Sequence, residues 1–287
     1  MVGIKEIKNK IKSVRSTQKI TKAMEMVAAS KMKRTQQKMV STRPFIFNIK
    51  AVVKNAVTGN LEYKHVYTVA RPTGVPGYII ISTDRGLCGG LNITLFKCIL
   101  EHMSKQMGGT TQVYPVSIIG KKGFSFFSRV SFVSVVASVL NLPSVSKFSD
   151  LVGCVKGMID MFVLGKVSVV YLAHNSFINT MSQKPYLYQL LPIVEDSSSA
   201  TKLWDYLYEP SAEELLSILF IRYVESIVYQ GFVENQACEQ AARMVAMKSA
   251  TENANEVVER FTLVYNKERQ AVITRELSEI VAGAAAV

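Results

Sequence analysis

The feature that most constrains the fold is a long run near the start of the chain that contains neither glycine nor proline. The run extends from Ile4 to Arg43 and consists mainly of helix-forming residues such as Lys, Ile, Met, Ala and Gln. A helix of that length would be roughly 60 Å long, whereas the average helix of a globular protein has only about 11–12 residues. Pro44 predicts a kink or a new start, and Phe45–Thr58 predicts a further helical piece that ends before Gly59.

Apolar residues in this run follow the spacing of a coiled coil. The three-four-three spacing is carried by Ile4, Ile7, Ile11 and Val14. The same frame then meets three polar residues and returns to apolar ones, in the order Gln18, Thr21, Glu25, Ala28, Met32 and Met39. The sequence therefore predicts a long helix whose apolar seam is interrupted near its middle.

The other end of the chain holds a similar run. Pro210, Ser211 and Glu214 have the spacing of a helix start with a capping box. From there to Ala282 only Gly231 interrupts the helical pattern, so a kink is expected near Gly231. Apolar residues predict the packing face of this helix, although their spacing does not keep a strict heptad register. They are Val257, Phe261, Val264, Ile273, Leu277, Ile280 and Ala284.

Charge is distributed unevenly between the two ends. The chain carries a net charge of +12; residues 1–50 hold thirteen Lys/Arg against two acids, a net +11, while residues 211–287 hold seven Lys/Arg against eleven Glu, a net −4. Neither long helix could bury its stripe inside an ordinary globule, and opposite charges attract. The sequence therefore predicts an antiparallel coiled coil of the N- and C-terminal helices.

Residues 75–195 alternate between strand and helix patterns. Strands are predicted at Val75–Ser82, Val113–Ile119 and Lys166–Ala173, and helices at Asn92–Met107 and Phe148–Leu164. This alternation is typical of a Rossmann-like α/β domain with a mostly parallel sheet, and residues 197–201 predict a surface loop. We expect three parts: an N-terminal long helix (1–58), an α/β domain (59–209) and a C-terminal long helix (210–287).

Composition and isolated residues argue against several classes of protein. We find no stretch of roughly 18 residues that is apolar and free of charge, so no membrane-spanning helix is expected. The four cysteines form no CxxC pair, which argues against a zinc site and against a disulfide framework: Cys88, Cys98, Cys154 and Cys238. The three histidines stand alone and are predicted to be structural: His65, His102 and His174.

A glycine-rich loop, Asp84–Asn92, lies between a predicted strand and a predicted helix, which is where phosphate-binding loops occur. The loop reads DRGLCGGLN, which matches neither GxxxxGK[ST] nor GxGxxG. A tight turn that needs glycine dihedral angles is the favoured interpretation, while nucleotide binding and contact with a partner protein stay open. Catalysis by Cys88 is not favoured, since no histidine lies near it in the sequence.

The basic N-terminal helix has a second interpretation, as an arm that binds nucleic acid. The spacing of Lys5, Lys8, Lys12 and Lys19 would suit contact with phosphates. Residues 1–44, however, contain no Phe, Tyr or Trp to stack on bases. An anionic membrane surface or an acidic protein collar would attract these lysines equally well, so charge alone does not decide between them.

Five separated blocks of the sequence together resemble one family. They are TQKITKAMEMVAASKM (Thr17–Met32) within Lys5–Lys38, STDRGLCGGLN (Ser82–Asn92), FINTMSQ (Phe177–Gln183), Arg222–Thr251 and ITRELSEIVAGAAAV (Ile273–Val287). In this order they resemble the blocks of F-type ATP synthase gamma subunits, over essentially the whole chain. The start MVGIKEIK and WDYLYEP (Trp204–Pro210) resemble gammaproteobacterial forms, whereas residues 107–165 depart most from the family pattern.

The resemblance implies a mechanical subunit without catalytic residues or a cofactor of its own. The two long helices would form a shaft inside a ring of alternating α and β subunits, with the α/β domain beside the epsilon subunit and the membrane c-ring. Proton flow would turn the c-ring and the shaft, and the β subunits, which hold Mg-ATP, would change nucleotide affinity in turn. The expected place is the cytoplasmic face of the bacterial inner membrane, as a peripheral protein that does not bind nucleic acid.

The resemblance also implies individual contact residues. Family members have rotor residues whose contacts with the stator are expected to break and re-form at each rotation step; we call them catch residues. The corresponding positions here are Met24 on the first helix and, on the second helix, Arg243, Arg269, Gln270 and Thr274. The loop that contains Arg85 and Cys88 corresponds to a family segment near an acid-rich lever of the β subunit.

Overall fold

A computed structural model describes residues 3–58, 65–71, 74–106, 112–143, 148–193 and 211–285. The chain divides into two compact units. We call Met1–Ser30 with Arg243–Val287 the coil unit, and Lys31–Ala242 the sheet unit. The surface loop predicted at residues 197–201, and the WDYLYEP block, lie outside the described residues.

Both terminal runs form helices, and neither is broken where a break was expected. Helix α1 spans Ile4–Thr58 with Pro44 inside it, and α5 spans Ala212–Ala285 and continues through Gly231. A new helix start at Pro44 is therefore wrong, while a kink at Pro44 or near Gly231 stays a prediction. Proline removes one helical hydrogen bond, but Val40, whose carbonyl loses its donor, is 59% exposed and open to water. The predicted start of α5 is confirmed, since the Ser211 hydroxyl accepts a 3.3 Å hydrogen bond from the Glu214 N–H.

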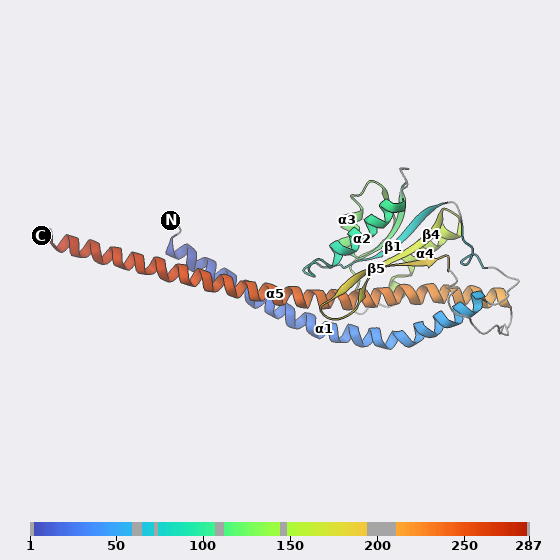
Figure 1. The fold of residues 1–287 in the computed structure, drawn as a ribbon, viewed down its shortest axis with the longest axis horizontal. Helices are drawn as coiled ribbons and strands as arrows, with labels where there is room; N and C mark the ends of the chain where they lie inside the picture. The colour runs from blue at the N-terminus through green and yellow to red at the C-terminus, as the bar shows by residue number, and fades with distance from the viewer. Residues whose placement is uncertain are drawn as a thin grey trace. The chain divides into compact units, whose positions relative to one another are not determined.

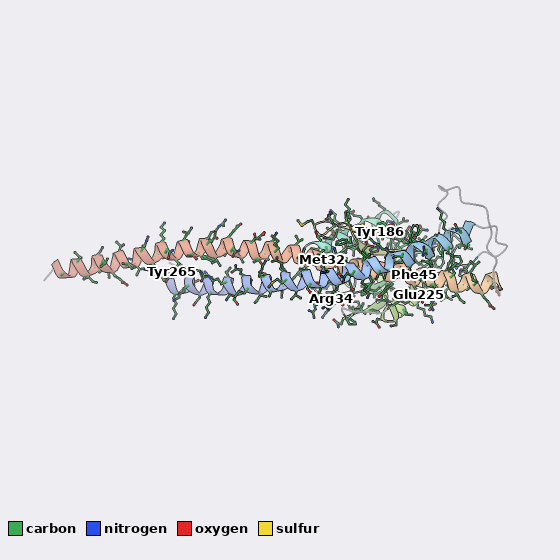
Figure 2. The ribbon with its side chains drawn as sticks, turned by 90° about the horizontal axis from the view of Figure 1, so that it is seen from below. Met32, Arg34, Phe45, Tyr186, Glu225 and Tyr265 are labelled. Atoms are coloured by element: carbon green, nitrogen blue, oxygen red, sulfur yellow. The ribbon has the colours of Figure 1, made fainter. Side chains whose placement is uncertain are left out.

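In the coil unit α1 and α5 lie side by side (Figures 1 and 2). The α1 residues of the predicted seam are all buried or half-buried, polar ones included: Ile4, Ile7, Ile11, Val14, Gln18, Thr21, Glu25 and Ala28. The matching seam of α5 has the same spacing of three and four: Met247, Thr251, Ala254, Val258, Phe261, Tyr265, Glu268 and Val272. The change to polar residues in α1 is therefore no interruption of the packing, which corrects the expected gap in the seam.

The face predicted for α5 from its apolar residues is wrong except at Phe261. The other members of that stripe are exposed, namely Val257, Val264, Ile273, Leu277, Ile280 and Ala284. The seam that packs instead includes Tyr265, labelled in Figure 2, and Glu268. Long amphipathic side chains can bury their apolar stems while their polar ends reach water, so a stripe chosen by hydrophobicity alone misses them.

The sheet unit contains one sheet of five strands in the order β3-β2-β1-β4-β5. The strands are β1 (Val75–Ile81), β2 (Tyr114–Ile119), β3 (Val133–Val139), β4 (Val167–Phe177) and β5 (Gln183–Leu191). Strands β3, β2, β1 and β4 pair in parallel, and β5 pairs with β4 antiparallel. The mostly parallel α/β sheet is thereby confirmed, although β3 and β5 were not predicted.

Helices cover both faces of this sheet (Figure 1). On one face, α2 (Leu91–Gln106) and α3 (Lys121–Phe127) bury a core with Tyr78 and Ile80 of β1. On the other face, α4 (Val152–Val163), with the short helix η1 (Phe148–Asp150), packs together with parts of α1 and α5 on Ile79 and Ile81. Alternate residues of β1 point to opposite faces of the sheet, so this strand anchors both layers.

One helix bears on the expectation that no segment spans a membrane. Among the described residues, the part of α5 between Glu213 and Ala284 includes an 18-residue window that would be long and apolar enough to cross a membrane by length and composition. Half of that window is buried inside the protein. The burial of Leu216, Phe220 and Val224 in the core against the sheet accounts for this apolar composition.

Candidate functional site

The glycine-rich loop after β1 is held by a carboxylate that accepts three backbone hydrogen bonds. The Oδ1 of Asp84 accepts from the N–H groups of Lys121 at 2.9 Å and Asn141 at 3.1 Å. Its Oδ2 accepts from the N–H of Leu142 at 3.0 Å. The loops that follow β1, β2 and β3 are thus tied to one side chain at one edge of the sheet.

The polar groups inside this loop bond to one another. The Asn92 side chain accepts from the Thr83 N–H at 3.3 Å and donates to the Thr83 hydroxyl at 2.7 Å. Leu87 and Gly89 have φ angles of 63° and 59°, the left-handed region that glycine adopts most readily. These observations support the tight-turn interpretation over a phosphate-binding loop.

Cys88 points into the protein, where it contributes to packing. It is 3% exposed and forms a small core with Leu91 and Cys238, against which Phe177 and Ala242 pack. The loop residues that present side chains to solvent are Arg85 and Leu87, and Leu87 is 61% exposed. In the predicted contact loop Arg85 and Leu87 are thus exposed, while Cys88 packs against α5.

A buried network of amides joins the end of β4 to α5. The Asn235 Oδ1 accepts from the Asn175 amide at 2.9 Å and from the Asn175 N–H at 3.3 Å. Beside it, the Glu234 carboxylate accepts from the Ser176 hydroxyl and from the Phe177 N–H, each at 2.9 Å. The Cys238 thiol donates to the Asn175 carbonyl at 3.3 Å, and burial raises the pKa of Cys238. Isolated polar residues gave no signal for this network, although the family block Arg222–Thr251 contains its α5 members Glu234, Asn235 and Cys238.

His174 and Gly231 form a second close contact between β4 and α5. A methyl group added to Gly231 would lie 3.0 Å from the His174 Cδ2 and 3.4 Å from the Ile81 Cδ1. His174 is 6% exposed. Burial lowers its pKa, the nearby Glu234 opposes that shift, and Lys50 adds to it. Gly231 is thus needed for the close approach of the histidine ring.

In the described part of the coil unit, polar contacts join α1 and α5 at neighbouring levels. The Gln18 amide donates to the Asn255 Oδ1, and one turn further along α1 the hydroxyls of Thr21 and Thr251 lie 2.8 Å apart. Residue numbers rise on α1 while they fall on α5, so the helices are antiparallel, as expected. Both contacts join neutral side chains, and the ion pairs Glu6–Lys10 and Lys22–Glu25 each lie within α1. The predicted attraction of opposite charges is therefore not what joins the helices at these two layers.

The predicted catch residues lie at two separate levels of the coil unit. Met24 is 40% exposed on α1, and Arg243 is half-buried on α5. Arg269, Gln270 and Thr274 are exposed, and the Thr274 hydroxyl donates to the Gln270 carbonyl at 2.9 Å. Since Thr21 faces Thr251, Met24 lies opposite a point about 20 residues before Arg269 on α5, or roughly 30 Å along the helix.

Metal binding finds no support in the part of the chain that the structure describes. Within those ranges no group of three or more His, Cys, Asp or Glu side chains is arranged to hold a metal ion.

Comparisons with known proteins agree, and each covers most or all of the chain. Residues 3–287 match the family model described as ATP synthase. A protein of Acinetobacter baumannii named ATP synthase gamma chain is 49% identical over 291 residues, covering 100% of this chain and 100% of that protein. The rotor structure of the Euglena gracilis mitochondrial ATP synthase aligns with a TM-score of 0.66 at 18% identity, covering 94% of this chain and 98% of that one. A central stalk and c-ring structure of the Tetrahymena thermophila mitochondrial ATP synthase aligns with a TM-score of 0.60 at 26% identity, covering 80% and 99%.

Proposed function

This chain belongs to the family of ATP synthase gamma chains, and we propose that it is the central rotor shaft of its ATP synthase. Its partners are the α and β subunits of a catalytic ring, the epsilon subunit and a membrane c-ring. Proton flow through the c-ring turns the shaft, and the turning shaft changes the nucleotide affinity of each β subunit in succession. The chain itself contributes no catalytic residue, since Mg-ATP binds to the β subunits.

The observation that carries this proposal is the paired α1 and α5 helices of the coil unit. Two seams with spacings of three and four face each other, and Gln18 and Thr21 of α1 contact Asn255 and Thr251 of α5. A pair of helices packed along their length resists twisting and bending better than a loop or a lone helix does, because each supports the other. Such an element suits the transmission of torque.

We assign the helices at 1–58 and 210–287 to the shaft and residues 59–209 to its foot. The foot lies at the membrane end of the complex, on the cytoplasmic face of the bacterial inner membrane. Anchoring of the foot to the shaft is supported by the bonds of Asn175 and Ser176 on β4 to Asn235 and Glu234 on α5. Buried polar groups that pair with one another favour a single arrangement.

We also propose two levels of contact between this shaft and the catalytic ring. The upper level comprises Arg269, Gln270 and Thr274, which are exposed on α5. The lower level of the coil unit comprises Met24 and Arg243. In the sheet unit, we propose that the glycine-rich loop presents Arg85 to an acid-rich lever of the β subunit. Arg85 is exposed, and an exposed guanidinium is suited to bind carboxylates.

The upper level is tested by Arg269→Ala with Gln270→Ala in the assembled ATP synthase. We expect slower ATP-driven rotation and lower ATP synthesis, because polar contacts between the shaft and the catalytic ring are lost at the upper level. Arg260→Ala, at an exposed arginine of the same helix without an assigned contact, is the matched control. Wild-type rotation and synthesis in the double variant would remove these two residues from the contact set.

The lower level is tested by Met24→Lys. A lysine there adds a charge beside the β lever, and we expect fewer protons pumped per ATP hydrolysed. Met26→Lys is the control, since Met26 is also exposed, at 59%, but lies about 200° further round the helix. An unchanged ratio of pumping to hydrolysis in Met24→Lys would contradict the assignment.

The whole proposal is tested by affinity purification of the full chain from cells that express it. Recovery of α, β and epsilon subunits in one assembly is the expected result. Recovery of the chain alone, with DNA binding that weakens as salt rises, would instead support the nucleic-acid interpretation.

A further inference from the structure

In the sheet unit, helix α1 carries an apolar stripe on its solvent side. The members of the stripe are spaced by four, three and four residues, so they lie within about 60° of one another on the helix. They are Val40, Pro44, Phe47 and Ala51, all exposed, and we call them the outer stripe. Phe47, at 74%, is the most exposed aromatic side chain in the part of the chain that the structure describes.

The outer stripe is separate from the face of α1 that builds the core. Ile46, Ile49 and Val53 of the same helix are buried in the core against the sheet and α5. They lie roughly 160° round the helix from the outer stripe. The solvent side of a surface helix is ordinarily polar, and an apolar side chain left in water contributes no burial to folding. Exposed apolar surface of this kind marks a contact with another molecule.

The two borders of the outer stripe differ in charge. Arg43, Lys50 and Lys54 follow one border, and Asn48 lies on the other. The sequence from residue 26 to residue 61 contains no Asp or Glu, so this part of α1 supplies no carboxylate to offset the basic border. A molecule that covers the outer stripe therefore meets positive charge along one side, which carboxylates complement.

The shape of the outer stripe fits a second helix. Apolar residues at spacings of three and four form the ridge along which two helices pack. From Val40 to Ala51 the ridge is roughly 16 Å long, which about three turns of a partner helix would cover. Amphipathic helices bind in this way through apolar anchors at helical spacing.

We infer that the outer stripe of α1 is a docking surface for an acidic amphipathic helix of another protein. Phe47 is the central anchor, and the carboxylates of the partner helix face the basic border that Arg43 begins. A further step rests on the proposed function: the partner turns together with the shaft. An aromatic anchor buried in a stationary subunit would have to be withdrawn at every rotation step, and a well-packed contact opposes that.

The test replaces Phe47 of the full chain by the photo-cross-linker benzoylphenylalanine in cells that express it. After irradiation, mass spectrometry identifies the cross-linked peptide. We expect a peptide from a co-rotating subunit, with apolar residues at helical spacing and Asp or Glu beside them. The matched control carries the cross-linker at Phe45, labelled in Figure 2, which is 61% exposed but lies about 200° round the helix. The control should lose this product.

A fluorescent synthetic copy of the cross-linked peptide then measures affinity for the purified full chain. Phe47→Ser should weaken binding about tenfold or more, because the central anchor is lost. Arg43→Glu should weaken binding more at low salt than at high salt, since salt screens exposed charges. Phe45→Ser is the control and should bind like the parent. Circular dichroism checks that each variant keeps its helices.

The outcomes separate this inference from the proposed function. The inference is overturned by a cross-link to lipid, to a second copy of this chain, to an α or β subunit or to a peptide without acidic residues, and by no cross-link above the control. Equal weakening by Phe45→Ser and Phe47→Ser overturns it as well. If an acidic helix is captured but the chain does not assemble with α and β subunits, the docking surface stands and the shaft function is contradicted.

Discussion

Gly231→Ala is the substitution whose expected effect depends most directly on the tertiary structure. In an exposed helix, replacing glycine by alanine stabilises a protein by about 1 kcal/mol, because glycine loses more backbone freedom on folding. At Gly231 the new methyl group would lie 3.0 Å from the His174 Cδ2, 3.3 Å from its Cγ and 3.4 Å from the Ile81 Cδ1. Favourable carbon contacts occur near 3.5–4.0 Å, so the ring must move.

The histidine has little room to move. Its Nδ1 lies 3.2 Å from the Asn175 carbonyl, and its ring packs at 63° against Tyr186 with 5.6 Å between the ring centres. Overpacking of a core costs about 1–3 kcal/mol. After the gain in helix propensity is deducted, we expect Gly231→Ala to lower the free energy of unfolding by about 0–2 kcal/mol.

Urea unfolding of the full chain, followed by circular dichroism, measures this difference. The matched control is Gly157→Ala in α4, where the added methyl would meet Ala137 and Val136 at ordinary distances of 3.7 and 3.9 Å. We expect that control to be stabilised by about 0.5–1 kcal/mol. In a His174→Ala background the space is vacated, and Gly231→Ala should there be neutral or stabilising. A Gly231→Ala variant that is stabilised over the parent as much as the Gly157→Ala control would refute the argument from crowding.

Three further predictions concern the sheet unit. Asp84→Ala removes the acceptor of three backbone N–H groups and should lower the free energy of unfolding by about 2–3 kcal/mol in urea titrations, with a smaller loss for Asp84→Asn. Burial lowers the pKa of His174 in the folded chain, so below about pH 6.5 the unfolded chain binds a proton at this residue that the folded chain does not bind. The free energy of unfolding should therefore fall as the pH is lowered through that value. The fall should be smaller in His174→Gln, which retains Glu234 and Lys50. Iodoacetamide labelling, measured by mass spectrometry without urea, should modify the half-buried Cys98 faster as the pH increases, because burial raises the pKa of this thiol. Buried Cys238 should stay unlabelled until the chain unfolds.

The parts of the fold that could be predicted are those with a strong local signal. Strand β1 and helix α2 were found almost to the residue, since a buried apolar run and an amphipathic period are written in neighbouring residues. Strand β3 was missed because it lies at the sheet edge, where half-buried and exposed residues alternate and serine replaces apolar side chains. Helix α3 spans only Lys121–Phe127, which is too short for a period to be recognised.

The candidate site residues likewise include features that the sequence could predict and features that it could not. The exposure of Arg269, Gln270 and Thr274 was compatible with their predicted contact role, which stays a proposal. Cys88 was placed in the correct loop, but its burial against Cys238 depends on a helix that lies 150 residues away in the chain. No local pattern reports such a contact.

The sequence by itself determined that both ends form long helices, that a mostly parallel α/β sheet separates them, and to which family the chain belongs. Only the tertiary structure decided which face of α5 packs on α1, why Gly231 lies in an unbroken helix, and that Gln18 and Thr21 have partners across the seam. The physical reason is that helix and strand propensities act between residues close in the chain. The burial of a side chain and the pairing of its polar atoms depend instead on whatever another segment brings opposite it.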